Sequence, residues 1–103
     1  MNWDEIEKYL KDRAQRIEVN SDWIQWYKNQ HSGRNRYPHR HGSDPYCGIC
    51  EEKIKLNETV YLFYVGGHLR RNLLSYHVNC VDGHINFKVK SIVEQDRAFR
   101  ETV

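Results

Sequence analysis

Residues 46–80 read YCGICEEKIKLNETVYLFYVGGHLRRNLLSYHVNC, and this stretch decides the fold of the chain. It opens with a Cys-x2-Cys pair and closes with a His-x2-Cys pair, and twenty-six residues separate the two pairs. Two ligands separated by two residues can turn to one side of a tight knuckle or of a first helical turn. Three thiolates and one imidazole complete a tetrahedral shell that suits zinc. The predicted cofactor is therefore one zinc ion held by Cys47, Cys50, His77 and Cys80.

The predicted shell is closed, and this favours a structural role for the metal. Catalytic zinc normally keeps one position for water or substrate, whereas four protein ligands leave none open. The alternative is three free buried cysteines and a histidine that finds other partners. The chain has three cysteines, an odd number that cannot form a closed disulfide framework, and all three fall into the pattern. Metal binding is the better interpretation.

The residues between the two ligand pairs have the pattern of a β-hairpin. Val60, Leu62 and Tyr64 alternate with Tyr61, Phe63 and Val65. The pair Gly66-Gly67 supplies a tight turn, after which residues 69–76 return. The expected order is a knuckle around Gly48, a hairpin, and then a helix or turn that carries the last two ligands.

This order resembles a treble-clef zinc finger. It looks like the Cys-Cys-His-Cys fingers of poly(ADP-ribose) polymerases, in which CxxC and HxxC flank an insertion of similar length, and it is similar to one half of a LIM domain. The resemblance covers roughly Tyr46 to Asp82 and rests on the ligand spacing and on the tyrosine before His77. The polymerase fingers bind broken DNA ends through backbone and base-stacking contacts, so the resemblance implies a contact with nucleic acid.

Two amphipathic helices are predicted before the metal-binding pattern. Apolar residues recur at steps of three and four from Trp3 to Ile17, with charged residues between them. Asn20 and Ser21 mark a break and an N-cap, and a second helix follows over residues 21–30. We expect the two helices to form a hairpin. The aromatic side chains of the second helix either pack in a core or dock onto a partner; they are Trp23, Trp26 and Tyr27.

The remaining segments complete the predicted architecture. Gly and Pro punctuate a polar run from residue 31 to residue 45, which indicates an exposed loop. The alternation in residues 84–90 predicts a short strand, and Ser91 with Glu94 has the spacing of a capping box that opens a final helix. The prediction is an α+β protein in one compact domain. Its parts are a helical hairpin (1–30), a basic loop (31–45) and a zinc-finger unit with a C-terminal helix (46–103).

Composition places the chain among intracellular proteins. Its 103 residues suit one domain, and the formal charge of +2 is nearly balanced. No apolar stretch approaches the roughly 20 residues that span a bilayer, and the first residues are too acidic for a signal peptide. Reduced thiols and metal binding fit a cytoplasmic or nuclear location, so we expect no membrane partner.

The charge distribution points to nucleic acid. Residues 31–42 contain three arginines, three histidines and no acidic residue. Together with the hairpin arginines they would contact phosphates, with Tyr37 or Tyr61 available to stack on a base. A solvated loop is the plain alternative. The predicted nucleic-acid-binding residues are Arg34, Arg36, Arg40, Arg70 and Arg71.

The expected function is therefore a non-enzymatic regulatory binding module with no small-molecule substrate. A protein-interaction adaptor or a homodimer that uses the aromatic helices is the second possibility. A third is a small zinc-supported nuclease of the HNH kind. Its motif is matched only in part, by Asp82, His84 and Asn86. His39, His41 and His68 are expected to be exposed loop or turn residues.

Overall fold

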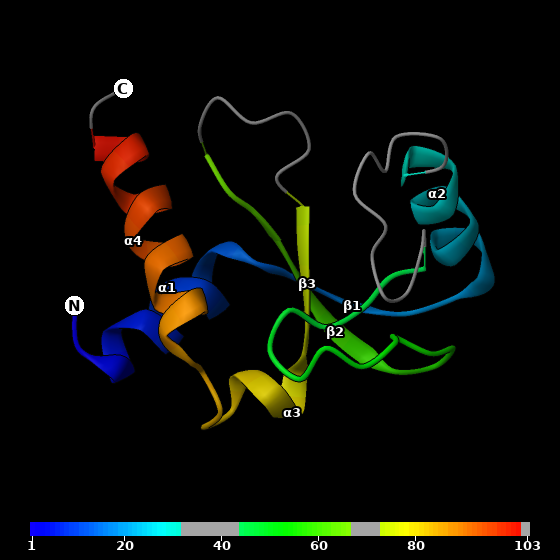
Figure 1. The fold of residues 1–103 in the computed structure, drawn as a ribbon, viewed down its shortest axis with the longest axis horizontal. Helices are drawn as coiled ribbons and strands as arrows, with labels where there is room; N and C mark the ends of the chain where they lie inside the picture. The colour runs from blue at the N-terminus through cyan, green and yellow to red at the C-terminus, as the bar shows by residue number, and fades with distance from the viewer. Residues whose placement is uncertain (32–43, 67–72, 102–103) are drawn as a thin grey trace.

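The protein is an α+β structure built on a three-stranded antiparallel sheet of order β1-β2-β3. The computed structural model describes residues 1–31, 44–66 and 73–101 (Figure 1). Helices α1 (Trp3–Arg13) and α4 (Phe87–Glu101) lie beside each other at one end of the sheet. Helix α2 (Ser21–His31) lies at the other end. None of the described helices is both long and apolar enough to cross a membrane.

The predicted hairpin is confirmed as strands β2 (Thr59–Tyr64) and β3 (Leu73–His77). They pair antiparallel, with Tyr61 opposite Tyr76. The predicted turn at Gly66-Gly67 and the first part of the return fall largely on residues 67–72, outside the described residues. The hairpin therefore carries His77, one predicted ligand, at the end of its second strand.

The predicted first helix ends earlier than expected, and the helical hairpin is wrong. Helix α1 stops at Arg13 because Ala14 has an extended backbone, with ψ of 150°. The chain then forms strand β1 (Gln15–Glu18), in which Ile17 lies opposite Val60 of β2. Pairing with β2 satisfies backbone groups that a longer helix would have satisfied internally. Because β1 runs along the edge of the sheet between the two helices, α1 and α2 lie at opposite ends of it (Figure 1).

Helices α1 and α2 are both capped at their N-termini by an asparagine side chain. The side chain of Asn2 accepts a hydrogen bond from the backbone N–H of Glu5 at 2.8 Å. The side chain of Asn20 accepts one from the N–H of Trp23, also at 2.8 Å. Each satisfies an N–H group that has no partner within its own helix. The predicted second helix is thus confirmed, but its cap is Asn20, and the predicted cap Ser21 is already the first helical residue.

The strand predicted over residues 84–90 is wrong, because α4 already begins at Phe87. The Asn86 side chain accepts a hydrogen bond from the N–H of Val89 at 3.1 Å and so caps the helix. Val89 and Val93, four residues apart, are fully buried, whereas Phe87 is 75% exposed. Helical spacing therefore explains the burial better than strand alternation. The predicted capping box at Ser91 lies inside the helix.

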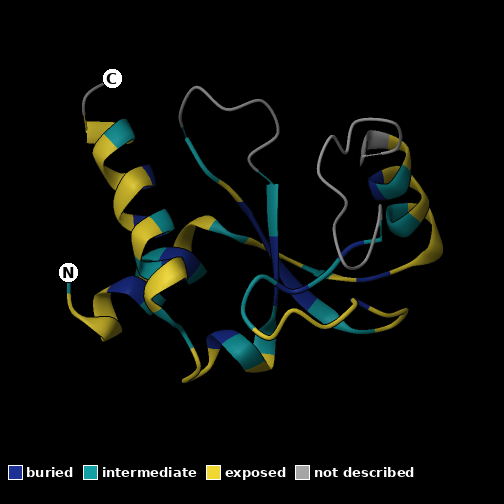
Figure 2. Cartoon of the chain, in the orientation of Figure 1, coloured by how far each residue is buried: buried dark blue, intermediate teal, exposed yellow. Residues whose placement is uncertain are grey.

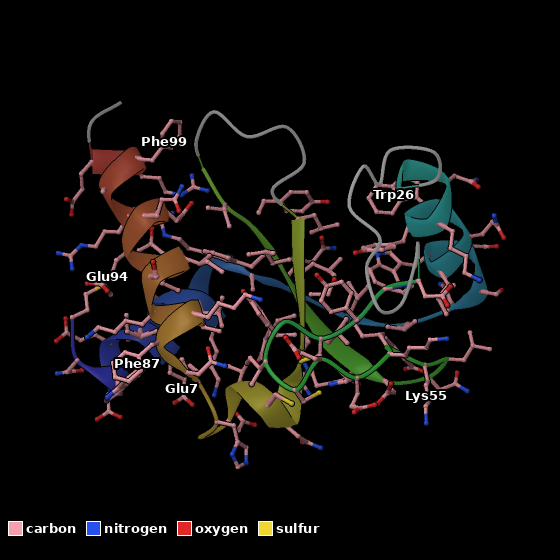
Figure 3. The ribbon with its side chains drawn as sticks, in the orientation of Figure 1. Glu7, Trp26, Lys55, Phe87, Glu94 and Phe99 are labelled. Atoms are coloured by element: carbon pink, nitrogen blue, oxygen red, sulfur yellow. The ribbon has the colours of Figure 1, made fainter. Side chains whose placement is uncertain are left out.

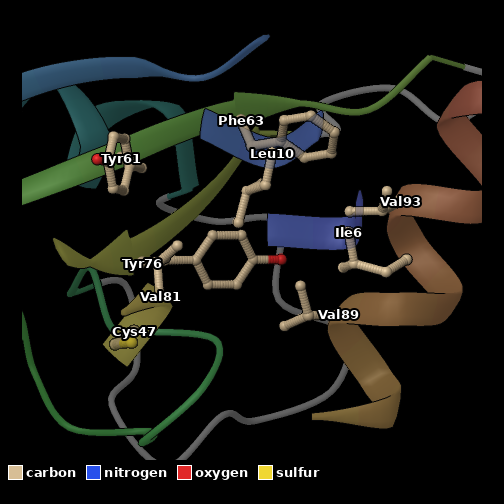
Figure 4. Packing of buried hydrophobic residues seen from close by; sticks show 9 residues of the cluster. All are labelled: Ile6, Leu10, Cys47, Tyr61, Phe63, Tyr76, Val81, Val89 and Val93. Atoms are coloured by element: carbon tan, nitrogen blue, oxygen red, sulfur yellow. The ribbon is translucent and has the colours of Figure 1, made fainter. Parts of the chain in front are cut away.

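Strand β2 is buried on both faces, so that segments from the N-terminal and C-terminal parts of the chain pack against the same strand. Successive side chains of a strand point to opposite faces. Phe63 packs with residues of α1 and α4 in the larger cluster, and Leu62 packs in a smaller cluster with residues of α2. Figure 2 colours the chain by burial. The buried residues of the larger cluster, shown in Figure 4, are Ile6, Leu10, Cys47, Tyr61, Phe63, Tyr76, Val81, Val89 and Val93. Those of the smaller cluster are Val19, Ile54, Val60 and Leu62.

Candidate metal centre

The first ligand pair lies on a tight turn that is closed by backbone hydrogen bonds. The N–H of Glu51 donates to the carbonyl of Cys47, and the N–H of Cys47 donates to the carbonyl of Glu52, each at 2.9 Å. Glu51 has a φ of 64°, a left-handed conformation that reverses the chain. The N–H of Ile49 points at the Cys47 sulfur, 3.4 Å away. This is the knuckle expected from the Cys-x2-Cys spacing.

Gly48 is required by packing. Its N–H donates to the carbonyl of Ser75 at 3.0 Å, which fixes the knuckle against β3. A Cβ atom at this position would lie 2.7 Å from the ring of Tyr76. Any larger side chain would therefore push the knuckle away from the strand that leads to His77.

The second ligand pair lies at the junction of β3 and α3 (Val78–Val81). His77 is the last residue of the strand and Cys80 lies in the short helix. The backbone N–H of His77 donates to the Cys47 sulfur at 3.4 Å. The Cys47 sulfur thus accepts two backbone N–H groups, which tie it to both ligand pairs.

The four predicted ligands come together at distances that suit one tetrahedral ion. Their ligand atoms all lie within 4.8 Å of one another. The Nδ1 atom of His77 is 3.4 Å from the Cys50 sulfur and 3.9 Å from the Cys80 sulfur. With Zn–S near 2.3 Å and Zn–N near 2.05 Å, a tetrahedral angle places sulfur and nitrogen about 3.6 Å apart. The two observed distances lie on either side of that value, so the cluster can bind a metal ion.

The centre extends from the core to the surface. Cys47 is fully buried beside Val81 and the ring of Tyr76, whereas Cys50 is exposed (Figure 4). Without a cation, burial and the neighbouring cysteines raise the pKa of the Cys80 thiol to about 12. A bound metal ion inverts this preference and holds the sulfur as a thiolate. Metal binding at this centre is therefore coupled to the release of protons.

Glu58 is a residue of this centre that the sequence did not reveal. Its Oε2 atom lies 3.4 Å from the Nε2 atom of His77, the ring nitrogen on the side away from the sulfurs. Its Oε1 atom accepts a hydrogen bond from the backbone N–H of Lys55, so the carboxylate is held by its own turn. When a metal ion takes Nδ1, the neutral ring carries its proton on Nε2, and the Glu58 carboxylate lies beside that nitrogen. Glu58 is close to His77 through strand pairing, since Val60 lies opposite His77.

Replacing Glu58 by glutamine is expected to weaken metal binding by about 10- to 100-fold. The variant keeps its oxygen for the Lys55 N–H and therefore turns an NH2 group, in place of a carboxylate oxygen, toward His77. Competition with a chromophoric chelator measures the affinity. Glu94→Gln, an exposed carboxylate on α4 (Figure 3), is the matched control and should bind as tightly as the wild type. Equal affinities for the two variants would remove Glu58 from the centre.

Most of the other candidate residues lie outside the described part of the chain, and the remaining ones lie near α3 and the start of α4. Arg34, Arg36, Arg40, Arg70 and Arg71, like His39, His41 and His68, lie outside the described residues. His84 is exposed after Gly83, whose φ is 94°. Asp82 accepts a hydrogen bond from the Lys11 ammonium at 2.6 Å, and Asn86 caps α4. Two residues of the partial nuclease motif, Asp82 and Asn86, therefore form contacts that stabilise the fold.

The aromatic residues of α2 are partly in the core. Burial, followed by the nearby Tyr46, raises the pKa of Tyr27 to about 12. Trp23 packs against the smaller cluster and its ring lies 5.5 Å from that of Tyr27. Trp26 is 43% exposed (Figure 3). Both predicted environments, core and surface, thus occur on one helix.

Comparisons with protein-family models, curated protein sequences and solved structures found no match to this chain. The features of this chain that indicate a function are the geometry of the centre and the distribution of charge.

Proposed function

We propose that the chain is a zinc-stabilised binding module in which the metal is structural and the finger is of the treble-clef kind. The observation that supports a structural metal is the donor set itself, since three sulfurs and one ring nitrogen complete a tetrahedral shell. The treble-clef assignment is supported by the order of elements. A knuckle with Cys47 and Cys50 is followed by the β2–β3 hairpin and by α3 with Cys80.

The proposed partner of the module is DNA or RNA, and the support is a separation of charge along the chain. All fourteen acidic residues lie in the described residues. Of the sixteen lysines and arginines, five arginines lie in residues 32–43 and 67–72, which leaves eleven. The folded body that the structure describes thus has a formal charge of −3, and the two connecting segments together have +5. A concentrated positive charge of this kind attracts a phosphate backbone.

Several cations of the described body already pair with carboxylates. Lys28 and Lys53 both lie 3.1 Å from the carboxylate of Asp44. Arg100 bonds Asp96 at 2.9 Å. In each contact the negative charge of the carboxylate offsets the positive charge of the cation, which weakens its attraction for phosphate. The proposal therefore places the nucleic-acid contact on the five arginines of the connecting segments, and it assigns no catalytic role.

Replacing both Arg70 and Arg71 by alanine is expected to weaken binding to a mixed-sequence oligonucleotide and to flatten its salt dependence. Each lost phosphate contact lowers the slope of log K against log salt by about 0.9 for duplex DNA. The slope should therefore fall by about 2 if both arginines contact phosphates. Fluorescence titrations between 50 and 200 mM salt, roughly the range in which such slopes are resolved, measure this change.

The matched control removes the same charge elsewhere. Lys8→Ala with Lys55→Ala takes two exposed cations from the described body. Its slope should change much less than that of the double arginine variant. Equal slopes for the two double variants, with both folded by circular dichroism, would contradict the assignment to Arg70 and Arg71.

A further inference from the structure

A pair of exposed aromatic rings lies where α1 and α4 begin. Trp3 is 43% exposed and Phe87 is 75% exposed. Their ring centroids are 5.2 Å apart with an interplanar angle of 69°, an edge-to-face contact. Figure 3 shows Phe87 and Glu7 at this end of the molecule. Large rings exposed together in a small protein indicate a contact surface.

The ring faces of this pair already attract a cation from the chain itself. The Lys90 ammonium lies 5.4 Å from the Trp3 ring centroid and 6.0 Å from that of Phe87. Both distances are within the range of a cation–π contact. Neither Lys90 nor Phe87 lines the hollow next to Trp3, so that hollow is a separate feature.

The hollow combines apolar walls with carboxylates. Its lining residues are Trp3, Asp4, Glu7, Gly83 and Ile85. Gly83 adds no side chain, so the walls are the indole and Ile85, with two carboxylates beside them. Lys11, one helical turn after Glu7, bonds Asp82 at 2.6 Å and lies 3.9 Å from Glu7. Lys11 is therefore oriented toward Asp82, and no lysine or arginine of the described residues lines the hollow.

We propose that this hollow binds a lysine or arginine side chain from a segment of a partner protein. The aliphatic stem would pack between Trp3 and Ile85, and the charged end would meet Asp4 and Glu7. An apolar neighbour in the partner segment would cover the exposed ring of Phe87. The negative charge of Asp4 and Glu7 favours a cationic side chain in the hollow, because the same carboxylates repel phosphate and anionic lipid. None of the five arginines proposed to contact nucleic acid is among the lining residues given for this hollow.

The test uses the full chain and a defined probe, the capped peptide acetyl-Gly-Leu-Arg-Leu-Gly-amide. Nitrogen-15 NMR follows the indole N–H signals of the three tryptophans, and Trp3→Phe assigns the signal of Trp3. The peptide should shift the Trp3 indole signal to saturation and leave the signals of Trp23 and Trp26 in place. A peptide with Glu in place of Arg should produce no saturable shift.

Three variants test which side chains of the hollow bind the peptide. Asp4→Asn with Glu7→Gln removes both carboxylates and should weaken binding about three- to tenfold, as expected for two exposed charge pairs. Asp12→Asn with Glu18→Gln makes the same charge change at exposed positions outside the hollow and should leave the affinity unchanged. Trp3→Ala, followed through the Gly83 amide, should weaken binding at least about tenfold.

Three results would overturn the proposal. One is a Trp3 signal that does not respond to the arginine peptide, or responds equally to the glutamate peptide. Another is a shift of the Trp3 signal caused by an oligonucleotide in place of the peptide. The third is a shift that depends on protein concentration alone, which would assign the hollow to a second copy of this chain.

Discussion

Removing the metal with a strong chelator is expected to unfold the protein at room temperature. Structural zinc contributes roughly 10–16 kcal/mol of apparent binding free energy in zinc-finger peptides, whereas a whole domain is stable by only about 5–15 kcal/mol. Here the centre includes Cys47, which is fully buried in the larger core cluster with residues of α1 and α4. Loss of the metal should therefore affect the whole molecule, and the knuckle would not unfold alone.

Near-UV circular dichroism and thermal unfolding, with and without the chelator, measure this effect. Stoichiometric zinc should restore the folded signal, and magnesium should not, because it prefers oxygen ligands. Cys47→Ser should behave like the protein without metal, even when zinc is present. An unchanged melting temperature after chelation, together with elemental analysis that finds no zinc in the purified protein, would contradict a structural metal.

Replacing Asp96 by alanine is expected to destabilise the fold by about 2–4 kcal/mol. The Asp96 side chain is fully buried and accepts hydrogen bonds from α1, from the segment after β2 and from its own helix, α4. They come from the Tyr9 hydroxyl at 2.7 Å, the Gly66 N–H at 2.6 Å and the Arg100 guanidinium at 2.9 Å. Alanine would leave the Tyr9 and Gly66 donors without a partner and would uncouple α4 from α1 and from the end of β2. Urea unfolding measures the change.

The matched control for Asp96 lies on the same helix. Glu101 forms an exposed pair with Arg97 at 2.9 Å, and Glu101→Ala should cost less than about 0.5 kcal/mol. Similar losses for the two variants would mean that the buried carboxylate has no special role. Asp96→Asn keeps the shape of the side chain and should fall between them.

The same carboxylate predicts a dependence of stability on pH. Burial alone would raise the pKa of Asp96, but the hydrogen bonds from Gly66, Tyr9 and Arg100 hold it below its ordinary value. A carboxylate with a lowered pKa stabilises the fold above its unfolded-state pKa of about 4 and loses that contribution as the pH falls through the folded-state value. The wild type should therefore lose more stability than Asp96→Asn when the pH falls below about 4.

The sequence by itself determined the features that depend on local spacing. The two Cys/His pairs bring ligands to one side of a short turn, and the alternation from Val60 to Tyr64 defines a strand. Likewise, Asn20 next to an apolar periodic segment marks the start of α2. Such features need no knowledge of distant residues.

Where a local pattern fitted both a helix and a strand, tertiary contacts determined which of the two formed. The spacing of Ile17 fits a helix, but Ile17 lies opposite Val60 as part of a third strand. The alternation around Phe87 fits a strand, but the burial of Val89 and Val93 against α1 requires a helix. Each choice depends on which partner covers the residue.

Glu58 and Asp96 belong to the same class of features. Neither has a distinctive sequence context, and each acts through a partner on another element, His77 for Glu58 and Tyr9 for Asp96. Strand pairing and helix packing create these contacts only after the chain has folded. The sequence therefore determined which residues can hold the metal, and the folded structure determined which carboxylates support the metal centre and the core.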